Sequence, residues 1–276
     1  MINTYLKFFN NKLVKGSKHI NVLEKKSKIL IKVKSCGICG SDINILKNGS
    51  KRVSNGTIMG HEIAGIIMKF KNNKFVNTNK NVLLGADIPN KKNLDYALGH
   101  ELDGGFQKYL EISKKNFRKI PHFITSKKIN FDYASLCEPL ACCLNGFNKI
   151  NFRKNKTVII FGAGPIGQLI ALICLYNKAS KIFIVDNNND KLKIGIKNKK
   201  INKINSKKFK QIKKNLSFDY GFVACSSGKA QNEILGVMKE NSTVNYFAGI
   251  KSKKKVNLVP INTNLIHYKK INIGLL

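Results

Sequence analysis

One stretch near the middle of the chain, residues 157–186, limits the possible folds more than any other feature. It opens with an apolar run, Val158–Phe161, that is short enough to be a buried parallel strand. Closely spaced glycines follow, and Ile166–Tyr176 then has the composition of an apolar helix. A second apolar strand, Lys181–Val185, ends at an aspartate. Strand, glycine-rich turn, helix and strand in this order predict a parallel βαβ unit.

The glycines have the spacing G-x-G-x-x-G, which suits the binding of a dinucleotide. Gly162 fits the tight turn, Gly164 leaves room for a pyrophosphate, and Gly167 lets helix and strand pack closely. The helix N-terminus offers free N–H groups to the phosphates. Asp186 can accept hydrogen bonds from ribose hydroxyls and would repel a 2′-phosphate, which favours NAD over NADP. The residues assigned to this cofactor are Gly162, Gly164, Pro165, Ile166, Gly167 and Asp186.

The same apolar region, Val158–Tyr176, is also long enough for a membrane-spanning helix, but three glycines and Pro165 in its first half argue against one. With 276 residues and 43% hydrophobic content, the chain can form two globular domains. Its N-terminus lacks the pattern of a cleavable signal, so we expect a cytoplasmic protein with no membrane partner. In that compartment the seven cysteines are expected to be thiols or metal ligands.

The net charge of +35 raises the question of a nucleic-acid partner. Only Arg52, Arg118 and Arg153 are arginines, so 47 of the 50 basic residues are lysines, and these are spread over the whole sequence. Dedicated nucleic-acid sites favour arginine forks and clustered patches. We therefore expect no specific nucleic acid, and a basic nucleic-acid-associated protein remains a lesser alternative.

A second informative region contains SCGICGSDINIL and IMGHEIAGII, after a predicted strand at Ile29–Val33. Cys39, His61 and Glu62 in this region are donors suited to zinc. They lack the regular spacing of a closed structural zinc site. Further along, Glu138 is a carboxylate in the apolar segment CEPLACCLNG, where it needs a cation or hydrogen bonds. These residues together indicate an open, catalytic type of metal site.

In combination these motifs resemble the zinc-dependent medium-chain dehydrogenase/reductase family, and most closely its sorbitol and threonine dehydrogenase-like branch. The resemblance rests on CGICGSD at 36–42, GHE at 60–62, CEPLA at 137–141 and the glycine fingerprint, and it covers nearly the whole chain. It implies an N-terminal GroES-like β-barrel catalytic domain at 1–147. It also implies a C-terminal Rossmann NAD-binding domain, a doubly wound parallel sheet, at 148–276, with the substrate between the two domains.

The resemblance also implies roles for single residues. It makes Cys39 and His61 ligands of one catalytic zinc, with Glu62 or Glu138 as the third protein ligand. Ser41 would contact the reacting hydroxyl, and Asp42 would orient a zinc ligand. The residues assigned to catalysis are therefore Ser41, Cys39, His61, Glu62 and Glu138. The histidines expected to be structural are His19, His100, His122 and His267.

Elsewhere the local patterns predict further elements. Residues 1–27 are polar and weakly patterned, and no element is predicted there. Tyr133–Phe147 reads as one helix that carries Glu138. The second half of the nucleotide domain is predicted as a strand, a helix and a strand, at Phe218–Val223, Ala230–Met238 and Thr243–Ala248.

Three departures from the family pattern limit what can be transferred. The segment that follows Gly85–Pro89 has no cysteines, so we expect no structural zinc. Asn44 stands where relatives often carry a histidine that relays the proton from the serine, and an amide cannot take up a proton at neutral pH. Relatives continue by tens of residues beyond the position of Leu276, so the resemblance implies a Rossmann domain that is incomplete at its C-terminus.

The sequence therefore predicts a zinc-dependent oxidoreductase that transfers a hydride from a secondary alcohol to NAD. The substrate would be a polyol, a sugar derivative or an amino alcohol. Exposed strand edges favour association with another chain, so we expect a homo-oligomer, either a dimer or a tetramer. The alternative is a truncated, catalytically weak relative that keeps NAD binding, which Asn44 and the short C-terminus suggest.

Overall fold

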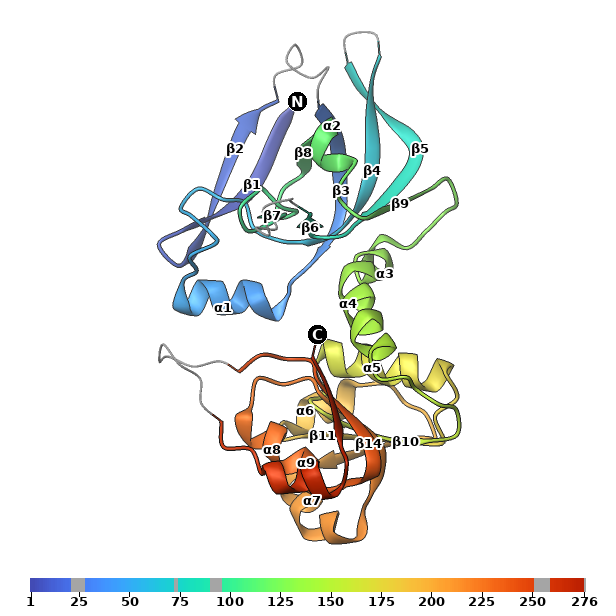
Figure 1. The fold of residues 1–276 in the computed structure, drawn as a ribbon. Helices are drawn as coiled ribbons and strands as arrows, with labels where there is room; N and C mark the ends of the chain where they lie inside the picture. Colours follow the sequence, from blue (N-terminus) through green and yellow to red (C-terminus); the bar gives the residue numbers. More distant parts are fainter. Residues whose placement is uncertain (21–27, 72–73, 90–95, 251–258, 276) are drawn as a thin grey trace. The chain divides into compact units, whose positions relative to one another are not determined.

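A computed structural model describes residues 1–20, 28–71, 74–89, 96–250 and 259–275 of the chain (Figure 1). These residues form two compact units, Met1–Pro139 and Leu140–Leu276. Along the chain, the boundary between the units lies near the start of helix α4 (Cys137–Asn148). The boundary predicted from the sequence, 147/148, lies at the end of the same helix. No helix in the described ranges is long and apolar enough to cross a membrane.

The first unit is built on an antiparallel sheet of five strands in the order β8-β3-β4-β5-β9. These strands are β3 (Lys28–Gly37), β4 (Glu62–Lys71), β5 (Lys74–Leu84), β8 (Tyr109–Ser113) and β9 (His122–Thr125). One face of the sheet is apolar and packs into a core that includes the fully buried Ile31, Ile63 and Leu110. The strand predicted at Ile29–Val33 lies inside β3 and is confirmed. The smaller elements of this unit are α1 (Gly40–Asn48), α2 (Lys114–Phe117), α3 (Phe131–Ala134), β6 (Asp87–Ile88) and β7 (Tyr96–Ala97).

The N-terminal segment forms a hairpin that the sequence analysis did not predict. Strands β1 (Ile2–Phe9) and β2 (Lys12–His19) pair antiparallel in register across the two residues between them. Those two residues, Asn10 and Asn11, both have positive φ, of 46° and 62°. A two-residue turn with both φ values positive matches the twist of the strands, and asparagine tolerates that conformation.

A buried amide joins this hairpin to the sheet. Asn3 is fully buried, and its Nδ2 donates to the side chain of Gln107 and to the carbonyl of Tyr109, both at 2.9 Å. The N–H of Tyr109 donates in return to Asn3 Oδ1 at 2.9 Å. The amide has its main hydrogen-bonding groups satisfied, which a buried asparagine requires.

The segment predicted as one helix at Tyr133–Phe147 is instead two helices, α3 and α4. Ser135 and Leu136 separate them, and Asn130 caps the first by accepting the N–H groups of Asp132 and Tyr133. The break places Glu138 in the first turn of α4. A carboxylate in the first turn of a helix is stabilised by the positive end of the helix dipole.

Residues between β6 and β7, where the structural-zinc lobe of relatives would lie, fall mainly outside the described ranges. The expectation that no structural zinc binds there therefore stays a prediction.

The second unit is a parallel sheet of six strands in the order β12-β11-β10-β13-β14-β15 (Figure 1). Its strands are β10 (Thr157–Phe161), β11 (Lys181–Asp186), β12 (Ile201–Asn205), β13 (Phe218–Val223), β14 (Met238–Tyr246) and β15 (Asn272–Leu275). Its helices besides α4 are α5 (Pro165–Tyr176), α6 (Asn189–Ile194), α7 (Ser206–Ile212), α8 (Gly228–Gly236) and α9 (Thr263–Tyr268), with a 3₁₀ turn at Lys213–Asn215. The strand order reverses between β10 and β13, and in such sheets ligands bind at the carboxyl ends of the strands at this point.

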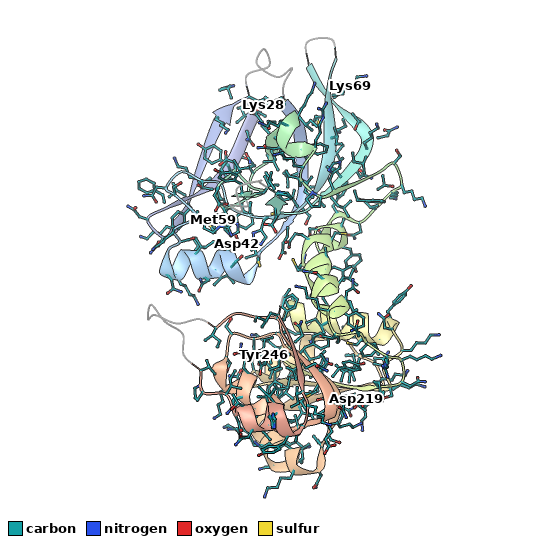
Figure 2. All side chains as sticks on the ribbon, viewed as in Figure 1. Lys28, Asp42, Met59, Lys69, Asp219 and Tyr246 are labelled. Atoms are coloured by element: carbon teal, nitrogen blue, oxygen red, sulfur yellow. The ribbon has the colours of Figure 1, made fainter. Side chains whose placement is uncertain are left out.

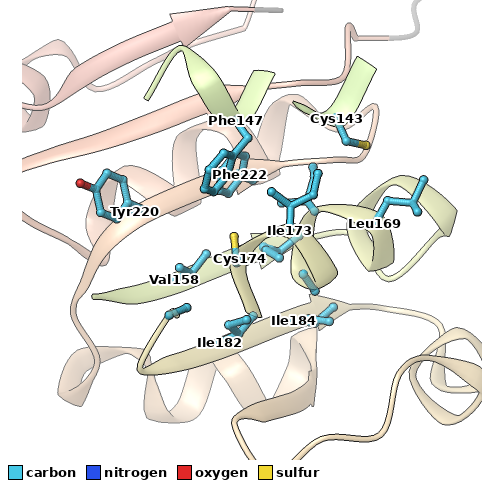
Figure 3. Packing of buried hydrophobic residues seen from close by; sticks show 14 of the residues in the cluster. Cys143, Phe147, Val158, Leu169, Ile173, Cys174, Ile182, Ile184, Tyr220 and Phe222 are labelled. Carbon is cyan, nitrogen blue, oxygen red and sulfur yellow. The ribbon is translucent and has the colours of Figure 1, made fainter. Parts of the chain in front are cut away.

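Each face of this sheet has its own apolar core because successive residues of a strand point to opposite sides. In β10, Val158 and Ile160 face the core that α4 and α5 cover, and Ile159 faces the core that α7 and α8 cover. Figure 3 shows the first of these cores, in which the rings of Phe147 and Phe222 stack with centroids 6.4 Å apart. Cys143 and Cys174 are fully buried in the same core, where they pack as small side chains.

Candidate metal and dinucleotide sites

The candidate metal ligands are brought together by the pairing of β3 with β4. Gly37, the last residue of β3, pairs with Glu62, the first residue of β4. A Cβ atom at Gly37 would collide with the carboxylate of Glu62, so a side chain here would displace that carboxylate from its present position. The chain then turns into α1, with Cys39 as its N-cap residue, while His61 directly precedes β4. Residues 22 positions apart in the sequence thus become neighbours.

These side chains form a group of metal-binding donors. Cys39 Sγ, a ring nitrogen of His61 and a carboxylate oxygen of Glu62 all lie within 4.8 Å of one another. Donors that share one zinc ion in a tetrahedron stand about 3.5 Å apart, so small side-chain shifts would close the set. One sulfur, one nitrogen and one oxygen donor suit zinc, and three protein ligands leave a fourth position open. The residues present therefore fit a catalytic zinc ion.

The electrostatics of this group also favour a cation. Burial lowers the pKa of His61, but the hydrogen bond with Cys39 and the charges of Asp42, Cys39 and Glu138 outweigh it and raise that pKa to about 9. Burial raises the pKa of Glu62, and the nearby charge of Glu138 acts in the same direction. Negative charge is thus concentrated around one buried imidazole, and a bound cation would compensate it.

Asp42 holds the group in place from α1 (Figure 2). It is 1% exposed, and its Oδ2 accepts the backbone N–H of Cys39 at 2.9 Å. Its Oδ1 lies 3.7 Å from Nδ1 of His61. A carboxylate next to one ring nitrogen orients the imidazole so that the other nitrogen can bind a metal. This is the place that the sequence analysis expected for Asp42.

Three buried polar atoms in this region have no hydrogen-bond partner among the described residues: Ser41 Oγ, Asp42 Oδ1 and His61 Nδ1. Buried polar atoms are nearly always satisfied in native proteins, so such a cluster needs an explanation. A ligand or an ion at the site would supply one. Ser41 Oγ is the nearest hydroxyl to the donor group along the chain, two residues from Cys39.

Of the remaining predicted residues, Glu138 is half-buried and its charge acts on both His61 and Glu62. The structure therefore brings Glu138 toward the donor group.

Asn44 lies on α1 about one turn after Ser41, and its Oδ1 accepts the side-chain N–H of Asn48 at 3.0 Å. The side-chain oxygen of Asn44 is thus engaged by a residue of its own helix, on the exposed side of α1.

His100 lies beside the donor group, although no sequence motif connects it to the site. Its ring centroid is 5.2 Å from that of His61, and its predicted structural role stays a prediction. Burial and the charge of His61 lower the pKa of His100. The two histidines are 39 positions apart, and no local spacing pattern connects them.

The glycine fingerprint of the second unit has the geometry that a dinucleotide needs. Gly162 has φ of +113°, a conformation that only glycine adopts readily, and it forms the turn after β10. A Cβ atom at Gly167 would collide with the carbonyl oxygen of Gly162, whereas a Cβ atom at Gly164 would meet nothing within 4 Å. Gly164 is also the N-cap of α5 and provides no side chain to its first N–H groups. Open space thus lies directly at a helix N-terminus, where phosphates bind.

Asp186 ends β11 beside this turn. Its Oδ2 accepts the N–H of Ala163 at 2.7 Å and its Oδ1 accepts the N–H of Asn188 at 2.8 Å. A pocket of about 390 Å³ opens next to Gly162 and Asp186, at the carboxyl ends of β10, β11 and β13. Three lysines that the sequence analysis did not single out also line it: Lys191, Lys210 and Lys229. No sequence motif marks them, because they come from three separate helices.

Comparisons with known proteins agree with this geometry. Residues 25–122 match the family of alcohol dehydrogenase GroES-like domains. The D-xylulose reductase of Saccharomyces cerevisiae is 27% identical over 177 residues, which is 58% of this chain and 48% of that protein. The sorbitol dehydrogenase of Halalkalibacterium halodurans is 27% identical over 199 residues, which is 65% of this chain and 56% of that protein. Residues 25–122 thus match a GroES-like domain, and the chain as a whole is similar to polyol dehydrogenases. It spans about half the length of the curated relatives that it matches.

Solved structures share the fold of this chain. An alcohol dehydrogenase from Thermotoga maritima is similar with a TM-score of 0.83 at 18% identity, covering 100% of this chain and 84% of that one. The galactitol-1-phosphate dehydrogenase of Escherichia coli is similar with a TM-score of 0.79 at 19% identity, covering 100% of this chain and 82% of that one. A GroES-like unit followed by a Rossmann unit is therefore the fold of this chain, as the sequence predicted.

Proposed function

We propose that the chain is a cytoplasmic, zinc-dependent dehydrogenase that transfers a hydride from a secondary alcohol to NAD. The substrate class is a polyol, a sugar derivative or an amino alcohol. The observation that carries the proposal is the donor group of Cys39, His61 and Glu62, with three donors of the types that catalytic zinc uses. A zinc ion held there would act as a Lewis acid and lower the pKa of an alcohol hydroxyl, and NAD would accept the hydride.

The first unit supplies the ligands and their positioning. Cys39 and His61 are two of the ligands in this proposal, and Glu62 is the third because its oxygen belongs to the same donor group. Glu138 remains an alternative third ligand, since its charge acts on both His61 and Glu62. Asp42 orients His61 from the other side of the ring.

Ser41 receives the proton of the alcohol in this proposal. Its buried hydroxyl has no hydrogen-bond partner in the described part of the chain, so it can donate to and accept from a substrate hydroxyl. Beyond Ser41 the proton must pass to water, because the amide of Asn44 cannot take up a proton. A slower proton exit at neutral pH follows from this difference.

The second unit holds NAD. Gly162, Gly164 and Gly167 shape the pyrophosphate site, with Pro165 and Ile166 opening helix α5 beside it. Asp186 would accept hydrogen bonds from the ribose, since each carboxylate oxygen that already accepts one N–H has a second lone pair. Its charge disfavours a 2′-phosphate, so we expect NAD to bind more tightly than NADP. Lys191, Lys210 and Lys229 would attract the phosphates of either cofactor.

Asp186→Ala should weaken the binding of NAD and reduce the preference for NAD over NADP. An unchanged ratio of the two dissociation constants would contradict the role assigned to Asp186.

The proposal is tested by zinc content and activity measured on the same preparations. Purified wild-type chain should contain one zinc ion and oxidise members of a polyol panel with NAD. Cys39→Ser and His61→Ala should lose zinc and nearly all activity while NAD still binds, since the dinucleotide pocket lies in the second unit. Cys174→Ala, which removes a thiol from the core of that unit, is the matched control and should keep its zinc. Activity that survives both ligand variants would exclude this function.

A second candidate is a catalytically weak relative that retains NAD binding. The hydrogen bond between Asn44 and Asn48 favours it, because the position of the proton relay is occupied by an amide held within its own helix. A folded, NAD-binding chain that contains no zinc and oxidises no alcohol would support this candidate over the first.

Oligomeric state is part of the proposal as well. We expect a homo-oligomer, a dimer or a tetramer, because β15 is an edge strand of the described sheet and exposes Ile273 and Leu275. Light scattering on the purified chain would distinguish these states from a monomer.

A further inference from the structure

A second pocket of the Rossmann unit lies at the end of the sheet opposite the dinucleotide pocket. Its volume is about 460 Å³, within the range of small-molecule sites. It is lined by residues that precede β10, by the start of β13, by Glu240–Thr243 of β14 and by the first residue of β15, so it sits toward the amino ends of the strands. Lys156 of this pocket and Gly162 of the dinucleotide pocket stand directly before and after β10, a strand of five residues, so they are about 20 Å apart along it.

Two basic residues of this pocket are available to a ligand. The pocket has five charged lining residues, which are Lys149, Arg153, Lys156, Asp219 and Glu240. No ion pair holds Lys149 or Arg153 among the described residues, and both are exposed to solvent. Glu240 is also exposed and lies at the rim. An arginine is notable in a chain with only three, and its guanidinium can bind a phosphate with two parallel hydrogen bonds.

The acidic wall of the pocket is already neutralised. Asp219 Oδ2 accepts the N–H and the hydroxyl of Thr157, at 2.9 and 2.7 Å, and Lys239 Nζ at 3.1 Å. Its Oδ1 lies 3.5 Å from Lys156 Nζ. With two lysines paired to this carboxylate, it offers little repulsion to an anion. The charge that a ligand meets is dominated by Lys149 and Arg153.

The rest of the lining is made of hydroxyl and amide groups. Ser242 is 3% exposed, and its hydroxyl has no hydrogen-bond partner in the described ranges. A buried hydroxyl without a partner costs free energy unless a ligand or water satisfies it. Thr243 and Asn272 lie next to each other across β14 and β15 and line the same pocket. Such groups recognise the hydroxyls of a sugar or polyol.

From these features we infer a second ligand site in this pocket for a phosphorylated polyhydroxy compound. Arg153 and Lys149 bind the phosphate, and Ser242 with its hydroxyl and amide neighbours binds the carbon chain. The site is separate from the dinucleotide pocket, and its occupancy does not depend on zinc or on catalysis. The inference therefore stands or falls independently of the proposed dehydrogenase function.

Isothermal titration calorimetry on the full chain tests the site, with D-sorbitol 6-phosphate, D-sorbitol and inorganic phosphate as probes. The measurements are made at about 150 mM salt, so that the general positive charge of the surface is screened. D-sorbitol 6-phosphate should bind at least tenfold more tightly than either of the other probes. Saturating NAD should leave this affinity unchanged.

Three variants separate the site from nonspecific attraction to lysines. Arg153→Ala should weaken binding by tenfold or more, as expected for a charge-assisted hydrogen bond. The fold should persist because the hydrogen bond from Arg153 to the Tyr220 hydroxyl uses the backbone N–H, which the variant keeps. Lys154→Ala removes the adjacent exposed lysine, which does not line the pocket, and should have no effect. Ser242→Ala should weaken D-sorbitol 6-phosphate several-fold while leaving the thermal midpoint unchanged or higher, because the lost hydroxyl has no partner.

Four results would overturn the inference. They are no binding of D-sorbitol 6-phosphate, equal binding of phosphate alone, displacement of the ligand by NAD, and equal losses in Arg153→Ala and Lys154→Ala. The first removes the site, the second removes the polyhydroxy class, and the last two place the ligand elsewhere.

Discussion

The link between β10 and β13 through Asp219 gives a stability prediction that can be worked out in advance. Asp219 is labelled in Figure 2, and its side chain is 15% exposed. Burial alone would raise its pKa, but the N–H and hydroxyl of Thr157 and the charge of Lys239 outweigh it and lower the pKa from 3.8 to about 2. A difference of this size corresponds to about 2 kcal/mol of unfolding free energy.

The sign of this contribution follows from the direction of the change. The pKa of Asp219 is lower in the folded chain, so its stabilising effect is complete above pH 3.8 and is lost as the pH falls through 2. Asp219→Asn should therefore lower the unfolding free energy by about 2 kcal/mol at pH 7 and by about 1 kcal/mol at pH 3. Urea titrations followed by fluorescence of the tyrosines, at both pH values, measure these differences.

The matched control is Asp190→Asn. Asp190 pairs with Lys193 at 3.5 Å, but both side chains are about four-fifths exposed, and such surface pairs contribute little. The variant should be within about 0.5 kcal/mol of wild type at either pH. A loss at Asp219→Asn no larger than this control, or a loss that does not shrink as the pH falls, would refute the reasoning.

The other predictions concern the two proposed sites. Asp42→Asn should lower zinc affinity by about 10- to 100-fold in a competition titration with a chromophoric chelator, because the carboxylate orients His61; equal affinities would remove that role. Gly164→Val should fold normally but lose NAD binding, since the new side chain has no protein neighbour and fills the pyrophosphate space; a folded variant with wild-type NAD affinity would show that the dinucleotide binds elsewhere. Asn44→His should increase kcat and move the pH profile, as a restored proton relay requires; an unchanged profile would show that the proton leaves by another path.

Local patterns predicted the second unit well because its elements depend on short-range sequence. The strand predicted at Phe218–Val223 coincides with β13, and the helix predicted at Ala230–Met238 overlaps α8 with a shift of about one half-turn. The strand predicted at Thr243–Ala248 overlaps the second part of β14, which ends at Tyr246. Apolar strands with both faces covered leave a continuous signal of this kind in the sequence.

The N-terminal hairpin was missed although its turn carried a signal. Tyr5–Phe9 and Lys12–Val14 flank Asn10 and Asn11, a dipeptide that tolerates the positive φ values of a two-residue turn. The many lysines on these strands hid the apolar alternation. Composition bias of this type weakens patterns that rest on the contrast between polar and apolar residues.

The partners of the metal group could not be predicted in the same way. The order of motifs pointed to Cys39, His61 and Glu62, and the structure brings those three together. His100 and the lysines of the dinucleotide pocket reach their positions through tertiary contacts alone. A site residue that belongs to no motif can be recognised only once the folded structure shows which residues lie beside it.

The hydrogen bonds of Asn3 impose an order of events on synthesis of the chain. Their partners lie 104 and 106 residues later, so the first strand is made long before the residues that secure it. At about 5–20 residues per second the interval is on the order of 5–20 s, and a two-stranded hairpin is marginally stable alone. During that time the side chain of Asn3, which is fully buried in the folded chain, lacks these hydrogen-bond partners. A chaperone could therefore bind the nascent hairpin during this interval, which ends when Gln107 and Tyr109 have left the ribosome.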